Sequence, residues 1–236
     1  MDKVFFSKIT DLNYSSKEAY NTLRTNIQFC GNEIKAITIT SSIAGEGKST
    51  VSFNLATSFA EDGKKVILLD ADLRKSVLIG RYKIQSIEAG LTNYLVGQKK
   101  IPEIIYNTNI NNMDIIFSGS NAPNPSELLD SIYFTKLIEQ LRADYDYIVI
   151  DAPPLGLVID SAIIAAKSDG AVLVIEEKAI SYRILRDVKN QLEKSNCKIL
   201  GTVLNKVHME DKKYYKKKFG KNYKKHYEKY YTKKTK

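Results

Sequence analysis

The stretch Ser42–Thr50, SIAGEGKST, decides the fold of this chain. It follows an apolar, β-branched run, KAITITS at 35–41, and leads into a helical pattern at about 48–62. Glycines at positions 45 and 47 let backbone N–H groups converge on an anion, and the start of a helix adds unpaired donors. A strand, a glycine-rich loop and a helix in this order predict a phosphate-binding loop, or P-loop.

The chemistry expected of such a loop depends on its last residues. Lys48 reaches the β- and γ-phosphates of a nucleotide, and Ser49 holds Mg²⁺. The strict pattern G-x-x-x-x-G-K-[ST] has glycine where this chain has Ser42, so the match is one residue short. The alternative is a glycine-rich turn with a chance GKS sequence, and the strand–loop–helix context favours the P-loop.

Strand and helix patterns alternate along the rest of the chain. Further buried strands are predicted at 64–70, 113–119, 145–151, 170–176 and 198–205. Helices are predicted at 126–143, 160–168 and 181–195, and an N-terminal helix at about 15–30 begins with a capping box of Ser15 and Glu18. This alternation predicts an α/β fold of the P-loop NTPase type, a mostly parallel sheet with helices on both faces. Ligands of such sheets bind at the carboxyl ends of the strands.

Acidic residues end two of the predicted strands. Asp70 and Asp72 close the run VILLDADLR, where a spacing of two on extended chain sends both side chains to one face. Asp151 ends YIVID. One of the first two could merely cap the next helix, and Asp151 could be a turn acid before the following prolines. Together with a lysine and a hydroxyl at neighbouring strand ends, however, they predict a site for Mg²⁺ and a nucleotide.

The composition bounds the class of protein. The chain has 236 residues, 43% of them hydrophobic, and two cysteines without metal-type spacing, which suits a reducing compartment. It contains no apolar run long enough for a bilayer span or a secretory signal. We therefore expect a cytoplasmic protein.

The charge is concentrated at the C-terminus. Segment 212–236 contains twelve lysines and one glutamate, a net charge of +11 against +9 for the whole chain. It also holds six of the fifteen tyrosines: Tyr214, Tyr215, Tyr223, Tyr227, Tyr230 and Tyr231. With few aliphatic residues it cannot bury enough surface to fold alone, so we predict a domain at 1–210 and a flexible tail at 211–236. A nucleic-acid contact is the alternative reading of this basic, aromatic tail.

Three segments together resemble a known family. SxxxGEGKST, LLDADLR and YIVIDAPPLGLVIDSA, followed by a tyrosine-rich C-terminus, resemble the bacterial tyrosine kinases of capsule and exopolysaccharide synthesis, in particular the free-standing CpsD/CapB type. The resemblance covers residues 15–236. It implies an ATP- and Mg²⁺-dependent protein-tyrosine kinase that phosphorylates its own tail and regulates polysaccharide synthesis and export.

The resemblance also implies residue roles. Gly45, Glu46, Gly47, Lys48, Ser49, Thr50 and Asn205 would bind the nucleotide, the last near adenine. Ser49, Asp70, Asp72 and Asp151 would hold the metal, while Lys48, Asp70 and Asp72 would be catalytic, one aspartate orienting or deprotonating the tyrosine hydroxyl. The six tail tyrosines would accept phosphate. Asp160 lies in a matching PPxxxxxD segment. Glu18 and Arg24 match an E-x-x-R-x-x-R motif tied to ring assembly, although Asn21 replaces its first arginine.

The implied partners follow from the same resemblance. They are other copies of the chain, possibly in a ring, a tyrosine phosphatase, and a membrane-anchored activator of the polysaccharide co-polymerase type. That activator would recruit the kinase to the inner face of the membrane, and no nucleic acid is expected. The competing hypothesis is a positioning ATPase of the ParA/MinD type without kinase activity. Such ATPases carry a lysine where this chain has Ile43, and they lack a tyrosine cluster.

Overall fold

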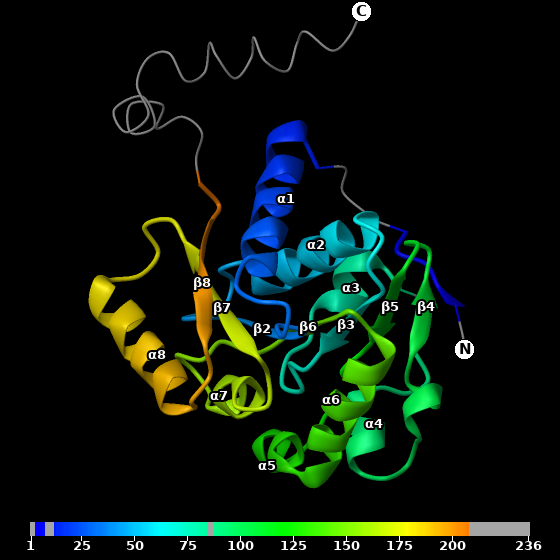
Figure 1. The fold of residues 1–236 in the computed structure, drawn as a ribbon. Coiled ribbons are helices and arrows are strands. Elements are labelled where there is room, and N and C mark those ends of the chain that lie inside the picture. Colours follow the sequence, from blue (N-terminus) through cyan, green and yellow to red (C-terminus); the bar gives the residue numbers. More distant parts are fainter. Residues whose placement is uncertain (1–2, 8–11, 85–86, 208–236) are drawn as a thin grey trace, which may run out of the picture. The chain divides into compact units, whose positions relative to one another are not determined.

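The computed structural model describes residues 3–7, 12–84 and 87–207 of the chain. Within these ranges, eight strands form one sheet in the spatial order β1-β4-β5-β3-β6-β2-β7-β8 (Figure 1). The strands are β1 (Lys3–Val4), β2 (Ala36–Ser41), β3 (Val66–Asp70), β4 (Tyr106–Thr108), β5 (Met113–Ile116), β6 (Tyr147–Asp151), β7 (Gly170–Glu176) and β8 (Ile199–Asn205).

The pairing of the strands confirms the predicted sheet. The strands pair in parallel, except that β4 runs antiparallel to β5. Each strand predicted from the sequence is present: β7 has the predicted bounds, and the others are one to three residues shorter than their apolar runs. The sequence did not predict β1 and β4, which are two and three residues long and too short to show a period.

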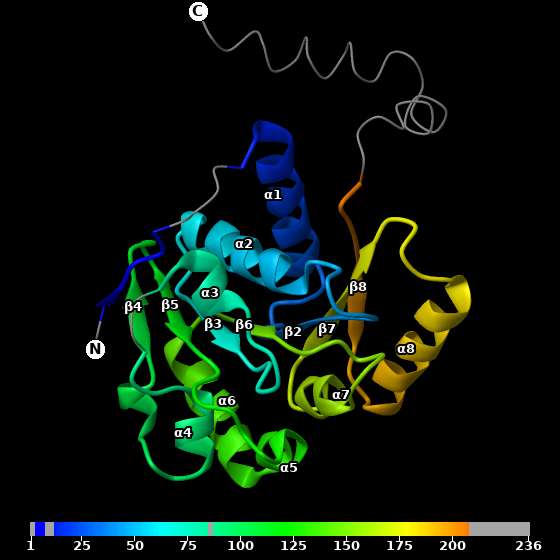
Figure 2. The ribbon, with the colours of Figure 1, turned by 180° about the vertical axis from the view of Figure 1, so that it is seen from behind.

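Helices cover both faces of the sheet (Figures 1 and 2). The face that carries α1, α2 and α3 is opposite the face that carries α4, α5, α6 and α7, and α8 packs beside β7 at one edge. The bounds are α1 (Tyr14–Gln28), α2 (Lys48–Glu61), α3 (Leu78–Tyr82), α4 (Leu91–Leu95), α5 (Pro125–Asp130), α6 (Ile132–Asp144), α7 (Asp160–Ala165) and α8 (Tyr182–Lys194), with a 3₁₀ turn, η1, at Ile101–Glu103. Because helices cover both faces, the loops that follow the strands lie at the edge of the sheet formed by the carboxyl ends of the strands.

Strand β3 shows why the apolar runs do not alternate with polar residues. Val66 and Leu68 belong to the core under α2, whereas Ile67 and Leu69 belong to the core under α6, and all four are fully buried. Successive side chains of a strand point to opposite faces, so a strand covered on both sides must be apolar throughout. Each such side chain stabilises the fold by about 1.5–3 kcal/mol.

Two boundaries differ from the sequence prediction. The N-terminal helix begins at Tyr14 with Asn13 as its N-cap, whose side-chain oxygen accepts from the N–H of Ser16 at 2.9 Å, so the predicted capping box of Ser15 and Glu18 is wrong. Asn13 is an equally good cap, placed two residues earlier, and its backbone is already extended.

The predicted helix at 126–143 is two helices. Ser131 has an extended backbone and separates α5 from α6. Serine is a favoured N-cap residue, and its hydroxyl donates to the carbonyl of Leu128 at 2.6 Å, which satisfies an oxygen at the end of α5. The apolar period continues across this break, so periodicity alone did not show it.

The predicted tail at 211–236, with its six tyrosines, lies outside the described residues. None of the helices in the described ranges is long and apolar enough to cross a membrane.

Candidate active site

The loop between β2 and α2 has the backbone that its glycines predict. Gly45 and Gly47 have φ angles of 90° and 94°, in the left-handed region. A Cβ added to residue 47 would lie 2.1 Å from Nδ2 of Asn205, at the end of β8. Only glycine meets both conditions at this position without strain.

Glu46 supports the loop from inside. Its side chain is completely buried. One carboxylate oxygen accepts from the backbone N–H groups of Ser42 and Ile43 at 2.7 and 2.9 Å, and the other accepts from Glu176 N–H at 3.2 Å. The amide of Asn205 donates to the carbonyl of Glu46 at 2.9 Å. The loop is thereby tied to the carboxyl ends of β7 and β8, and the Glu46 side chain is turned away from the loop's open side.

Lys48 begins α2 and meets the predicted acids. Its Nζ lies 3.4 Å from Oδ2 of Asp72, and both side chains are largely buried. The other oxygen of Asp72 accepts from the backbone N–H of Arg74 at 3.3 Å and of Lys75 at 2.9 Å. Asp72 therefore organises the loop after β3 while it faces the P-loop lysine.

Asp70 and Asp151 lie in register on adjacent strands, and both are buried. Burial, with the Asp151 charge as the next cause, raises the pKa of Asp70 to about 7. Burial also raises the pKa of Asp151, against the opposing effect of Lys48. Ser76 donates to Asp70, and Ser52 donates to Asp151 at 3.1 Å. Negative charge is thus held in a poorly solvated place, where a cation would relieve it.

Arg74 and Asp160 join two elements at this edge. The guanidinium donates through Nε to one carboxylate oxygen at 2.7 Å and through Nη2 to the other at 3.0 Å. Ser126 on α5 donates to the same carboxylate at 2.7 Å. Burial alone would raise the pKa of Asp160, but these hydrogen bonds outweigh it and hold the pKa below its ordinary range. The side chain of Asp160 is engaged by these partners at the start of α7.

A cavity of about 350 Å³ opens over the loop. Its walls include Gly45, Gly47, Lys48 and Ser49 of the P-loop, the acid Asp72, the cations Arg74, Lys75 and Arg81, and the apolar side chains of Val77, Pro153, Pro154, Leu157 and Val158. Asp70, Asp151 and Asp160 are buried and do not line it. The tertiary structure therefore brings the predicted loop and strand-end residues into one place.

Some residues of this site were missed by sequence reasoning. Arg81 on α3 donates to the hydroxyl of Thr50 and lines the cavity. Ser52, Ser76 and Ser126 donate to the buried aspartates. Ser52 lies one turn after Lys48, a signal that could have been used. The others are near only because of the fold, and no local pattern marks them.

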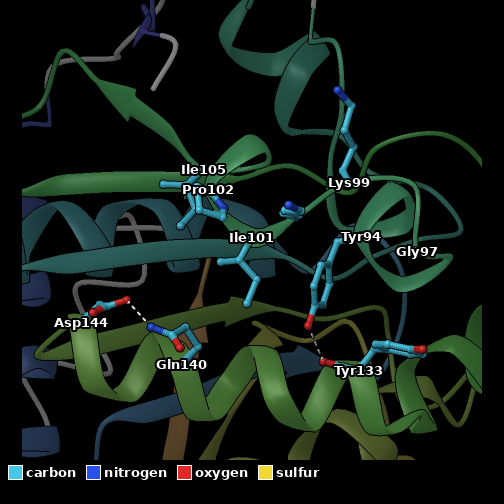
Figure 3. A pocket seen from close by; sticks show the side chains of 10 residues that line it. Tyr94, Gly97, Lys99, Ile101, Pro102, Ile105, Tyr133, Gln140 and Asp144 are labelled. Atoms are coloured by element: carbon cyan, nitrogen blue, oxygen red, sulfur yellow. Dashed lines mark hydrogen bonds between the residues drawn. The ribbon is translucent and has the colours of Figure 1, made fainter.

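A second cavity, of about 570 Å³, lies elsewhere, between α4, η1 and α6 (Figure 3). In Figure 3 the Tyr94 hydroxyl points to the backbone oxygen of Tyr133, a hydrogen bond of 3.3 Å, and Gln140 faces Asp144. None of the residues predicted to bind a nucleotide lines it. We therefore place the candidate active site over the P-loop.

The residues predicted for ring assembly make contacts within the chain. Arg24 donates to the carbonyl of Ser58 at 2.7 Å and lies 3.4 Å from the carboxylate of Asp62, so it joins α1 to α2. Glu18 accepts from the amide of Asn21 at 3.2 Å. The predicted phosphate acceptors of the tail lie outside the described residues.

Comparison with known proteins gives the site a context. Residues 34–204 match the family model of the AAA domain. The chain is 47% identical over 193 residues to the tyrosine-protein kinase CpsD of Streptococcus agalactiae, an alignment that covers 82% of this chain and 84% of the relative.

Two solved structures place the fold. The kinase domain of the Escherichia coli tyrosine kinase ETK superposes with a TM-score of 0.78 at 31% identity, over 82% of this chain and 76% of that one. The septum site-determining protein MinD of Pyrococcus horikoshii, solved with Mg-ADP, superposes with a TM-score of 0.63 at 29% identity, over 72% and 70% of the two chains.

Proposed function

This chain belongs to the family of bacterial tyrosine-protein kinases that includes CpsD, and from that premise we propose how its own residues transfer phosphate from ATP to tyrosine. The observation that carries the proposal is the Lys48–Asp72 contact of 3.4 Å in the wall of the cavity. This contact brings the P-loop lysine, which follows β2, to the acidic motif that follows β3. A nucleotide held by the loop would present its terminal phosphate to these acids.

The donor set fits Mg²⁺. The hydroxyl of Ser49 is close enough to Asp151 to oppose the rise in the pKa of that carboxyl, and buried Asp70 lies in register with Asp151 on the adjacent strand. In the described part of the chain, no group of three or more acidic, histidine or cysteine side chains is arranged to hold a metal by itself. That suits Mg²⁺, which is usually bound by one or two carboxylates together with water and substrate phosphates. Ser49, Asp151 and Asp70 would hold the ion, which would neutralise charge on the phosphates.

The remaining requirement for catalysis is alignment of the tyrosine hydroxyl with the phosphate that is transferred. A tyrosine hydroxyl, with a pKa of about 10, is a poor nucleophile at neutral pH. Phosphoryl transfer is loose, so catalysis consists mainly of placing the hydroxyl in line with the phosphorus and stabilising charge. Of the two neighbouring acids, Asp72 lines the cavity, whereas Asp70 is covered by Ser76. We therefore assign contact with the incoming hydroxyl to Asp72, and contact with the phosphates to Lys48 and the loop N–H groups.

The test is labelling of the full-length chain with ATP and Mg²⁺, followed by phosphosite mapping. We expect label on tyrosines between Tyr214 and Tyr231, loss of label in Lys48→Met, and full labelling in the control Lys136→Met on the exposed side of α6. Release of free phosphate with every tyrosine unmodified would contradict the proposal.

The positioning-ATPase alternative has less support. MinD shares the sheet, but it superposes less closely than the ETK kinase domain does. Ile43 in the loop also lacks the charge of the lysine that those ATPases carry. The fold is common to both classes and does not separate them. The site residues and the sequence identity of 47% with a tyrosine-protein kinase favour the kinase.

Assembly and partners are the further part of the proposal. We propose homo-oligomers, a membrane-anchored activator that brings the kinase to the membrane, a tyrosine phosphatase that reverses the reaction, and a role in capsule or exopolysaccharide synthesis. Arg24 is engaged with α2, so an oligomer that used it would have to compete with Ser58 and Asp62. Sedimentation of wild type and Arg24→Ala would show whether this residue contributes to assembly.

A further inference from the structure

Helix α3 is held firmly against α2, next to the P-loop. Its first and last residues, Leu78 and Tyr82, are buried. The ring of Tyr82 stacks on Phe53 of α2 with centroids 4.1 Å apart and an angle of 27° between the planes. Phe53 lies one turn after Thr50, where α2 has just left the loop. The packing therefore determines where the residue before Tyr82 lies.

That residue is Arg81, and its side chain reaches the P-loop. Its guanidinium donates to the hydroxyl of Thr50, and it forms part of the cavity wall beside Lys48 and Ser49. Within the described ranges, Lys48 pairs with Asp72 and Arg74 pairs with Asp160, whereas the other two cations of the cavity wall, Lys75 and Arg81, have no ion-pair partner. The Arg81 guanidinium is exposed and lies beside the first turn of α2. A cation without a counter-ion at the N-terminus of a helix is suited to binding an anion.

We propose that Arg81 binds the phosphates of the nucleotide that ATP and ADP share. This inference rests on the proposed nucleotide site and adds a residue to it. Thr50 lies in the first turn of α2, and in a P-loop the backbone there cradles the α- and β-phosphates, while the lysine reaches further along the chain of phosphates. Arg81 at Thr50 thus meets the inner phosphates. Arg81 thus supplies, from α3, a positive charge that Ile43 does not supply from the loop.

The planar fork of arginine makes this more than a charge effect. A guanidinium can donate two parallel hydrogen bonds to one phosphate, which a lysine cannot. Arg81→Lys should therefore retain only part of the affinity. The alternative is that Arg81 serves only to tether α3 to α2 through Thr50, in which case its loss would lower stability and leave affinity unchanged.

The experiment measures dissociation constants of the full-length chain for ATP and for ADP, each with MgCl₂, by isothermal titration. We expect Arg81→Ala to weaken both by about tenfold, as for the loss of one charge-assisted hydrogen bond. Arg81→Lys should lie between that value and wild type. The matched control is Arg183→Ala on α8, another exposed arginine, and it should bind like wild type.

Three results would overturn the inference: unchanged affinity in Arg81→Ala, with or without a lower melting temperature; a loss confined to ATP; or a wild type that binds neither nucleotide. The kinase proposal fails separately, since a wild type that binds nucleotide but never labels tyrosine would end that proposal and leave the role of Arg81 intact.

Discussion

Asn205 and Gly47 are in contact across the mouth of the P-loop, where the Asn205 amide nitrogen lies 2.1 Å from the point that a Cβ on residue 47 would occupy. The same amide donates to the carbonyl of Glu46, 159 residues away in the sequence. A Cβ at position 47 would therefore force the Asn205 side chain to move and to give up its hydrogen bond to Glu46. Glycine at 47 thus suits the packing against β8 as well as the backbone angle.

Gly47→Ala should abolish measurable ATP binding, because the residue needs a φ of 94° and space that Asn205 occupies. The control is Gly63→Ala, which also has a positive φ, 79°, but has open space around its Cβ. That variant should lose about 1–2 kcal/mol of unfolding free energy and keep wild-type affinity. Titration with ATP and urea unfolding measure the two effects. Equal affinities in both variants would refute the steric argument.

Glu46→Gln should destabilise the loop, since both carboxylate oxygens accept from backbone N–H groups, and either orientation of the glutamine amide would turn its NH₂ group toward one of these donors. We expect the unfolding free energy to fall by about 2 kcal/mol and the dissociation constant for ATP to rise. Glu139→Gln, on the exposed face of α6, is the control and should change neither. If Glu46→Gln bound ATP like wild type, the buried carboxylate would have no part in holding the loop.

Asp160→Asn should loosen the segment after β3, because it removes the charge that receives both arms of Arg74. A loss of about 2 kcal/mol is expected, less than for a fully buried pair because Arg74 is partly exposed. Urea denaturation measures it, with exposed Asp187→Asn on α8 as the control. Arg74→Lys should show a similar loss because lysine cannot form the two-armed contact. Unchanged stability in both variants would show that the pair is dispensable.

The metal-free protein should become less stable as the pH rises toward 7. The folded pKa of Asp70 is about 7, above its ordinary 3.8, mainly because of burial. The folded state therefore binds the proton more tightly, and this contribution is complete below about pH 4 and is lost as the pH rises through 7. Asn at this position resembles the protonated acid, so the stability of Asp70→Asn relative to wild type should increase by roughly 3 kcal/mol between pH 5 and pH 8.

Urea unfolding in EDTA at both pH values measures this difference between Asp70→Asn and wild type. Comparison of the two proteins removes the contribution of titrating groups that do not interact with Asp70. A difference in stability that does not change between pH 5 and pH 8 would mean that Asp70 titrates near its ordinary pKa in the folded protein.

Local patterns were enough to predict the sheet and the loop. Strands β2, β3, β5, β6, β7 and β8 are confirmed, as are helices on both faces. Buried parallel strands need continuous apolar runs, and the carboxyl ends of such strands share one edge, so Lys48, Asp70, Asp72 and Asp151 could be placed together without coordinates. Short elements such as β4 and α3, and the break at Ser131, escaped because a few residues show no period.

By itself, the sequence determined which residues lie at strand ends, because side-chain direction and strand ends follow from neighbours along the chain. Only the tertiary structure decided which of them touch. Arg81 reaches Thr50 because Tyr82 stacks on Phe53, and Asn205 reaches Glu46 because β8 ends beside the loop. Such contacts depend on how helices pack on a twisted sheet. Many side chains that are distant in the sequence determine this packing together, so no single stretch of sequence predicts it.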